Sequence, residues 1–323
     1  MSLLHLPNEL LRTISEYSES ERDINAIAQA NRRLFTLLNG YLYRYNVQQS
    51  GSSALLWAAR HGYEASAENL LREQANIQTT NDDDEAPLLL AAKNGHTQIV
   101  KLLLDHGAHP NINAEGGLYG NALYAASERG YTAIVKMLLN KGADPNVNGH
   151  GRVYGNALYA ASERGYEAVV KMLLEKGAEV NVQHGYYGDA LQTASSRGHK
   201  AVVQLLLNNG AEVNARCGEL GNSLQAASFR GYKAVVQLLI GNGADVNARG
   251  GDFGNALQAA SYKGDEAVVE ILLDNGADVN ARGGWYSNAL HAASHRGHEA
   301  VVDMLMAWGA KSLQNTGIGF RDI

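Results

Sequence analysis

The sequence is poor in cysteine and in positive charge. Cys217 is the only cysteine among 323 residues, so no intrachain disulfide can form, and a zinc site built from several cysteines is excluded. The 27 Lys and Arg residues are outnumbered by 33 Asp and Glu residues, and the net charge of −6 argues against general nucleic-acid binding. No apolar run reaches the roughly 18 residues of a membrane helix. We therefore expect a cytoplasmic or nuclear protein that neither spans a membrane nor binds nucleic acid.

Sequence motifs for catalysis and cofactor binding are also missing. There is no Gly-Lys-Ser/Thr phosphate loop, no dinucleotide-binding glycine motif after a strand and no Gly-x-Ser-x-Gly. His291, His295 and His298 have a metal-like spacing, but Gly297 ends the expected helix before His298, so a structural role is preferred. We predict no metal site, no cofactor and no catalytic residue, although these absences alone do not exclude an enzyme.

Glycine, in contrast, is abundant and periodic. One series ends strings similar to Ala-Ala-Ser-x-Arg-Gly and comprises Gly62, Gly95, Gly130, Gly165, Gly198, Gly231, Gly264 and Gly297. A second series precedes strings similar to Ala-Asp-Val-Asn and comprises Gly107, Gly142, Gly177, Gly210, Gly243, Gly276 and Gly309. Every spacing within the two series is 33 or 35 residues. This period predicts a solenoid of eight repeats.

Each repeat is interpreted as two short helices and a turn. In repeat six, Asn222 is placed to cap a thin first helix that Gly231 ends, and residues 235–239 give the second helix an apolar stripe. The glycine-rich residues 245–254 predict a β-turn finger. The cap column of the other repeats reads Ser53, Ala86, Asn121, Asn156, Asp189, Asn255 and Asn288, with Pro87 after Ala86.

The order cap-x-Leu-x-x-Ala-x-x-x-Gly-x-x-x-Val-Val-x-x-Leu-Leu-x-x-Gly-Ala-Asp-Val-Asn resembles the ankyrin repeat. The resemblance covers about four fifths of the chain. It implies an all-α solenoid with β-turn fingers over residues 51–311, a tail at 312–323 and partner binding on a concave face. The family's Thr-Pro-Leu-His start is replaced by Asn-Ala-Leu-Tyr/Gln in repeats three, four and seven, and only His291 keeps the histidine. The string Gly-Asn-Ala-Leu-Gln-Ala-Ala-Ser resembles the repeats of ankyrin arrays that are common in filamentous fungi.

Residues 1–50 do not follow the repeat pattern. Leu-Pro-x-Glu-Leu-Leu-x-x-Ile from Leu6, then Asp-Ile-x-x-Ile and Arg-x-Leu-x-x-Leu-Leu, predict two or three short amphipathic helices and resemble an F-box. That resemblance implies docking on a Skp1-type adaptor of a cullin ubiquitin ligase. The adaptor-binding residues would be Leu6, Pro7, Leu10, Leu11 and Ile14. Alternatively, these helices only cap the exposed face of repeat one, and the two roles are compatible.

Two columns in the repeats suggest a binding surface. The residue before the inner glycine is His61, Asn94, Arg129, Arg164, Arg197, Arg230, Lys263 and Arg296 in successive repeats. The finger column contains Tyr119, Tyr154, Tyr187, Leu220, Phe253 and Tyr286, with Tyr186 and Trp285 adjacent. The cations would either form a basic ladder for an acidic partner or stabilise their own helix ends. The rings would either fill space between fingers or supply contact area.

We interpret the chain as a protein–protein interaction module that recruits a target as an F-box-like ankyrin adaptor. A scaffold without ligase coupling is one alternative. A small-molecule-binding or catalytic groove lined by Tyr, Glu and Arg is the other. The predicted partner-binding residues, centred on repeats three to seven, are Tyr119, Glu128, Arg129, Tyr154, Glu163, Arg164, Tyr186, Tyr187, Arg197, Phe229, Arg230, Phe253, Tyr262 and Lys263.

Overall fold

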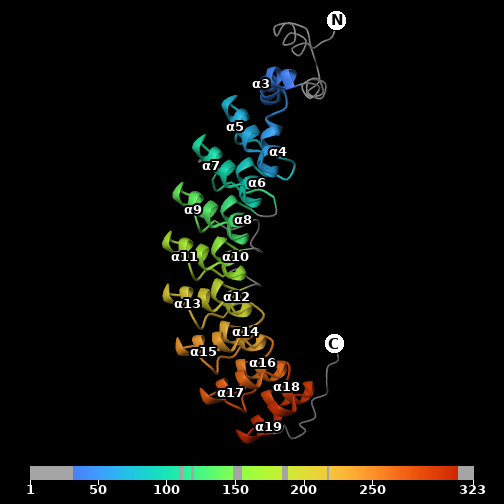
Figure 1. Cartoon of the computed structure of the whole chain (residues 1–323). Coiled ribbons are helices and arrows are strands. Elements are labelled where there is room, and N and C mark those ends of the chain that lie inside the picture. The colour runs from blue at the N-terminus through green and yellow to red at the C-terminus, as the bar shows by residue number, and fades with distance from the viewer. Residues whose placement is uncertain are drawn as a thin grey trace. The chain divides into compact units, whose positions relative to one another are not determined.

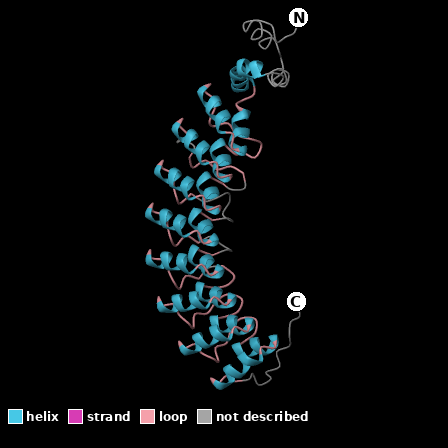
Figure 2. Cartoon of the chain, in the orientation of Figure 1, coloured by secondary structure: helices cyan, strands magenta, loops and turns pink. Residues whose placement is uncertain are grey.

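A computed structural model describes residues 32–108, 112–117, 120–147, 155–183, 188–216 and 218–311, with side chains from residue 40 onward. The chain divides into two compact units, residues 1–150 and 151–323. In the described residues all 17 regular elements are helices and no strand occurs, which confirms the predicted all-α class (Figure 2). None of the described helices combines the length and the apolar character that a membrane crossing requires.

The described residues of the first unit form one long helix and three helical pairs (Figure 1). The long helix is α3 (Arg32–Gln49), and the pairs are α4 (Ser53–His61) with α5 (Glu64–Arg72), α6 (Pro87–Lys93) with α7 (Thr97–Asp105), and α8 (Ala122–Glu128) with α9 (Thr132–Asn140). The first helices pack in the order α4, α6, α8, and the second helices in the order α5, α7, α9. Helix α3 packs on both helices of the first pair.

The second unit repeats the same pattern five times. Its pairs are α10 (Ala157–Arg164) with α11 (Glu167–Glu175), α12 (Ala190–Arg197) with α13 (Lys200–Asn208), α14 (Ser223–Arg230) with α15 (Lys233–Gly241), α16 (Ala256–Lys263) with α17 (Glu266–Asp274), and α18 (Ala289–Arg296) with α19 (Glu299–Ala307). First helices form one row and second helices another, as Figure 1 shows for this unit. The C-terminal ends of α14, α16 and α18 therefore lie in successive positions of one row.

Local sequence signals determine where the helices begin and end. The cap residues of α8, α10, α12, α14, α16 and α18 each accept a hydrogen bond from the backbone N–H three residues later, as predicted. Gly231 ends α14 with φ of 76°, a left-handed conformation that other residues adopt only at a cost. Between the rows, Ala226 and Val236 are fully buried, so small first-helix side chains pack against aliphatic second-helix side chains.

The cap of the first repeat does not follow the prediction. Ser53 is the first residue of α4 rather than its cap, and the residue before it, Ser52, makes no side-chain cap bond. Asn46 of α3 replaces the missing cap: its Oδ1 accepts from the Ala54 N–H at 3.0 Å, and its Nδ2 donates to Ser53 Oγ at 3.2 Å. Asn46 is 2% exposed. Helix α3 thus closes the first pair through a tertiary contact.

Candidate functional site

Aromatic and cationic side chains gather along the C-terminal ends of α14, α16 and α18 and on the fingers between these helices. We call this set the aromatic–cation surface. It consists of Phe229, Arg230, Phe253, Tyr262, Lys263, Trp285, Tyr286, His295 and Arg296. All of these residues belong to the second unit.

The rings of this surface form a continuous series of contacts. Phe229 stacks on Phe253 with ring centroids 4.6 Å apart, and Phe253 meets Tyr262 at 5.1 Å. Phe253 also lies 5.9 Å from Trp285, and Tyr262 lies 5.1 Å from Tyr286. Such aromatic pairs add stability beyond the area they bury. The contacts join helix residues to finger residues, so the fingers are held against the helix row.

Exposure differs among these rings in a way that suits partial contact with a partner. Phe253 is buried at 9% exposure, Phe229, Tyr262 and Tyr286 are half-buried, and Trp285 is 69% exposed. Burial raises the pKa of Tyr286, and Tyr262 raises that pKa further through its hydrogen bond and charge, against a lowering effect of Arg296. The Tyr286 phenol therefore stays neutral at physiological pH and keeps its proton.

The cations lie over ring faces. Lys263 Nζ is 4.8 Å from the centroid of Phe229, and Arg230 Cζ is 5.6 Å from the same centroid. Arg296 Cζ is 4.8 Å from the centroid of Tyr262. Cation–π contacts of this kind attract the cation without neutralising its charge.

One position in the repeat provides the contact for Arg197 and for Lys263 of the following repeats. Glu163 of α10 forms an ion pair with Arg197 of the following repeat, 34 residues later, at 2.6 Å. The residues equivalent to Glu163 in α14 and α16 are Phe229 and Tyr262. The same step of 34 residues then brings Lys263 over Phe229, as Arg197 is brought to Glu163. An aromatic residue in place of Glu thus replaces an ion pair with a ring contact.

A buried glutamine holds the finger that carries Phe253. Gln225 of α14 is 3% exposed, and its Oε1 accepts from the Asn222 N–H at 2.9 Å. Its Nε2 donates to the carbonyl oxygens of Ala248, Gly250 and Gly254 at 3.2, 3.1 and 3.3 Å. The finger itself is closed by a bond from the Gly250 N–H to the Gly254 carbonyl at 2.9 Å, as expected for a turn. Gln225 therefore connects the first helix of repeat six to the finger that follows the second helix of the same repeat.

The structure brings five of the predicted partner-binding residues together, and they are Phe229, Arg230, Phe253, Tyr262 and Lys263. Four neighbours were not in the predicted set, namely Trp285, Tyr286, His295 and Arg296. The sequence signal was present for Tyr286 and Arg296, which continue the finger and cation columns into repeat eight, and Trp285 is adjacent to Tyr286. Predicted residues that lie outside the described part of the chain are Tyr119, Tyr154, Tyr186, Tyr187, Leu6, Pro7, Leu10, Leu11 and Ile14.

The remaining predicted residues lie in, or directly after, the first helices of repeats three to five. Arg197 pairs with Glu163, and Arg129 Nε lies 3.3 Å from Glu128 Oε2. Arg164 is exposed at the end of α10. The carboxylates of Glu163 and Glu128 therefore partly neutralise the basic ladder that the sequence suggested.

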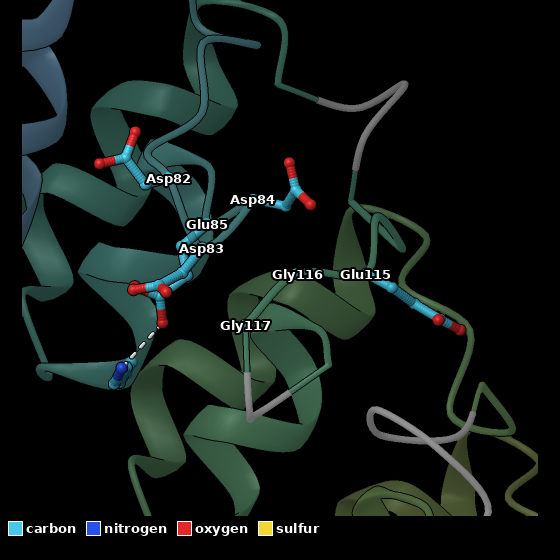
Figure 3. Close-up of a pocket in the computed structure, with 8 residues that line it drawn as sticks. Asp82, Asp83, Asp84, Glu85, Glu115, Gly116 and Gly117 are labelled. Carbon is cyan, nitrogen blue, oxygen red and sulfur yellow. Dashed lines mark hydrogen bonds and ion pairs between the residues drawn. The ribbon is translucent and has the colours of Figure 1, made fainter.

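The first unit contains a separate hollow of about 550 Å³, lined by residues 82–85, Lys93 and residues 115–117. Figure 3 shows the carboxylates of Asp82, Asp84 and Glu115 pointing in different directions. In agreement, the described residues contain no group of three His, Cys, Asp or Glu side chains arranged to hold a metal ion. We find no converging chemistry in this hollow.

Glu85 lies at the base of the hollow and is bound by its own chain. It is 2% exposed, and Lys93 Nζ donates to its Oε1 at 2.8 Å. Asn81 Nδ2 donates to Oε2 at 3.1 Å, and Arg60 lies 3.6 Å from that oxygen. Burial raises the Glu85 pKa, but the bonds from Lys93 and Asn81 and the charges of Lys93 and Arg60 outweigh it, so the pKa is lowered. Glu85 therefore has a structural role, because its carboxylate links Arg60 of α4 to Lys93 of α6.

Comparisons with known proteins agree with this architecture. A family model described as ankyrin repeats (3 copies) matches residues 24–114, 55–149, 111–184, 158–250 and 223–316. Ankyrin repeat domain-containing protein 49 of Bos taurus is 38% identical over 68 residues, which is 21% of this chain and 29% of that protein. The crystal structure of the human ASB11 ankyrin repeat domain superposes with a TM-score of 0.62 at 25% identity, over 69% of this chain and 98% of that one. The chain thus spans less than a third of the curated relative that it matches.

Proposed function

The chain belongs to the ankyrin-repeat family, and from that premise we propose that it recruits a protein target through the aromatic–cation surface of α14, α16 and α18. Ankyrin repeats are protein-interaction modules, so protein binding is the general role of the array. The observation that carries the specific proposal is Trp285, which is 69% exposed and in contact with the packed ring of Phe253. Tryptophan anchors of this kind dominate the binding energy of protein interfaces.

The first test compares two exposed tryptophans in affinity capture of proteins from a lysate, followed by quantitative mass spectrometry. Trp285→Ala should lose the specific target at least about tenfold, because an interface hot spot contributes roughly 2 kcal/mol. Trp308→Ala is the matched control, since Trp308 is 49% exposed but lies at the C-terminal end of α19, which contributes no residue to the aromatic–cation surface. Equal retention of every captured protein by the two variants would remove this surface as the target site.

We further propose that residues 1–50 couple the array to a Skp1-type adaptor, so that the chain acts as a substrate receptor of a ubiquitin ligase. The F-box-like pattern from Leu6 to Ile14 supports this part of the proposal, and it lies outside the described residues. Within the described part, Asn46 of α3 accepts a hydrogen bond from the Ala54 N–H of α4, which is compatible with such a segment leading into the repeats.

A double substitution tests the adaptor directly. Leu10→Asp with Ile14→Asp should abolish binding of a purified Skp1-type adaptor, because two charges would replace apolar contacts. Circular dichroism of the same variant should retain the helical signal of the repeats, and Trp285-dependent target capture should persist. If the wild-type chain shows no adaptor binding at micromolar concentration, the ligase role fails and the target-binding role is unaffected.

A further inference from the structure

The cations of the aromatic–cation surface differ from those of neighbouring repeats in what lies opposite them. Arg197 is matched by Glu163 at 2.6 Å. For Arg230, Lys263 and Arg296, no carboxylate of the described residues lies within 4 Å. Three positive charges in three successive repeats are therefore attracted to rings but not compensated. A partner that supplies anions at these points would complete the charge balance.

The rings interleaved with these cations set the second requirement on a partner. Phe229 and Tyr262 are half-buried, so part of each ring remains accessible beside a cation. Trp285 extends the accessible apolar area on the adjoining finger. A segment that is only acidic would leave these rings in water, whereas apolar side chains between the acidic ones would cover them.

The spacing favours an extended partner over a helical one. Packed neighbouring helices lie about 8–10 Å apart, so cations at equivalent helix ends recur at about that interval. An extended chain in the polyproline II conformation rises about 3.1 Å per residue with three residues per turn, so every third side chain lies on one face at an interval of about 9.3 Å. A helix rises 1.5 Å per residue and returns to nearly the same face after seven residues, at about 10.5 Å, which exceeds this interval.

We propose that the aromatic–cation surface binds an extended acidic segment of a partner protein. Carboxylates at every third position face Arg230, Lys263 and Arg296, and apolar side chains between them cover Tyr262 and Trp285. This inference rests on the proposed target-binding function and specifies its partner chemistry. A single-stranded nucleic acid also combines anions with stackable rings. The chain has a net charge of −6, and it repels a strand with one negative charge per nucleotide more than a segment with one carboxylate per three residues.

The probe is a fluorescein-labelled peptide in which Asp recurs at every third position with Leu and Tyr between, measured by fluorescence anisotropy with the full chain. Lys263→Glu with Arg296→Glu should weaken its binding at least about tenfold, and most strongly at low salt. The matched control is Lys200→Glu with Lys233→Glu, which changes the net charge equally on exposed residues of α13 and α15. The control should change affinity less than about twofold.

Further probes make the outcome decisive. A peptide of the same composition with contiguous Asp residues should bind at least about fivefold more weakly, and equal binding would overturn the extended geometry. Tighter binding of oligo-dT than of the peptide, with the same dependence on Lys263 and Arg296, would replace the acidic segment by nucleic acid. If the peptide does not bind while Trp285 still controls target capture, the acidic-segment inference fails and the proposed function stands. If Trp285 controls no capture either, both fail.

Discussion

Replacing Glu85 by alanine is expected to lower the free energy of unfolding of the first unit by about 3 kcal/mol, the lower end of what breaking a buried ion pair costs. Glu85 is 2% exposed, whereas its partners Lys93 and Arg60 retain 25% and 51% of their side-chain exposure. Water can therefore solvate the two cations partly after the carboxylate is lost. The Asn81 amide loses its acceptor as well.

The same carboxylate gives this unit a defined pH dependence. The folded pKa of Glu85 is lowered from 4.5, so the carboxylate binds fewer protons in the folded state than in the unfolded state. Its stabilising contribution is fully present above pH 4.5 and is lost as the pH falls through the lowered pKa of the folded state. Wild-type chain should therefore lose stability more steeply below pH 4.5 than a Glu85→Gln variant, which has no charge to titrate.

Urea unfolding followed by the fluorescence of Trp57 measures both effects, in a chain where Trp285 and Trp308 are replaced by Phe. Trp57 lies in α4, the helix that supplies Arg60 to the Glu85 contact. Glu85→Gln is the shape-matched control and should cost less than Glu85→Ala, because an amide oxygen can still accept from Lys93. A Glu85→Gln chain with the same acid profile as wild type would contradict the assigned charge role.

Much of the fold was predictable because its determinants are local. Asn222 caps α14 and Gly231 ends it within ten residues of sequence; the cap needs a side-chain acceptor for a backbone N–H, and the end needs a residue that tolerates a left-handed φ. Asn46 illustrates the limit: it caps α4 from another helix, across eight residues and a change of direction. A capping search restricted to adjacent positions selects Ser53 instead.

The candidate site was only partly predictable for a similar reason. The columns that contain Phe229 and Lys263 are visible in the sequence, because the repeat period aligns them. Arg197 pairs with Glu163 and Lys263 rests on Phe229, and in both cases the partner lies 34 positions earlier in the chain. This register between successive repeats follows from packing and cannot be read from either column alone. The burial of Glu85 likewise depends on the close approach of Gly117. A Cβ added at Gly117 would lie only 2.7 Å from Glu85 Cγ.

Replacing Gln225 by alanine is expected to lower the free energy of unfolding by about 3 kcal/mol, because a buried amide with several backbone partners is lost. The Gln225 side-chain amide donates to the carbonyl oxygens of Ala248, Gly250 and Gly254. Its Oε1 accepts from the Asn222 N–H. The change should also release the finger that carries Phe253. Target affinity should then fall along with stability, although Gln225 itself is buried and contacts no partner.

Gln258 is the matched control, since it occupies the same position in α16 and is 2% exposed. Its Nε2 donates to the Ala281 carbonyl at 3.2 Å, and its Oε1 has no hydrogen-bond partner among the described residues. Gln258→Ala should therefore cost only about 1 kcal/mol. Urea unfolding followed by Trp285 fluorescence measures both variants, and hydrogen exchange at residues 248–254 reports whether the finger is released. Equal costs for the two, with unchanged exchange in that finger, would show that Gln225 does not hold the Phe253 finger in place.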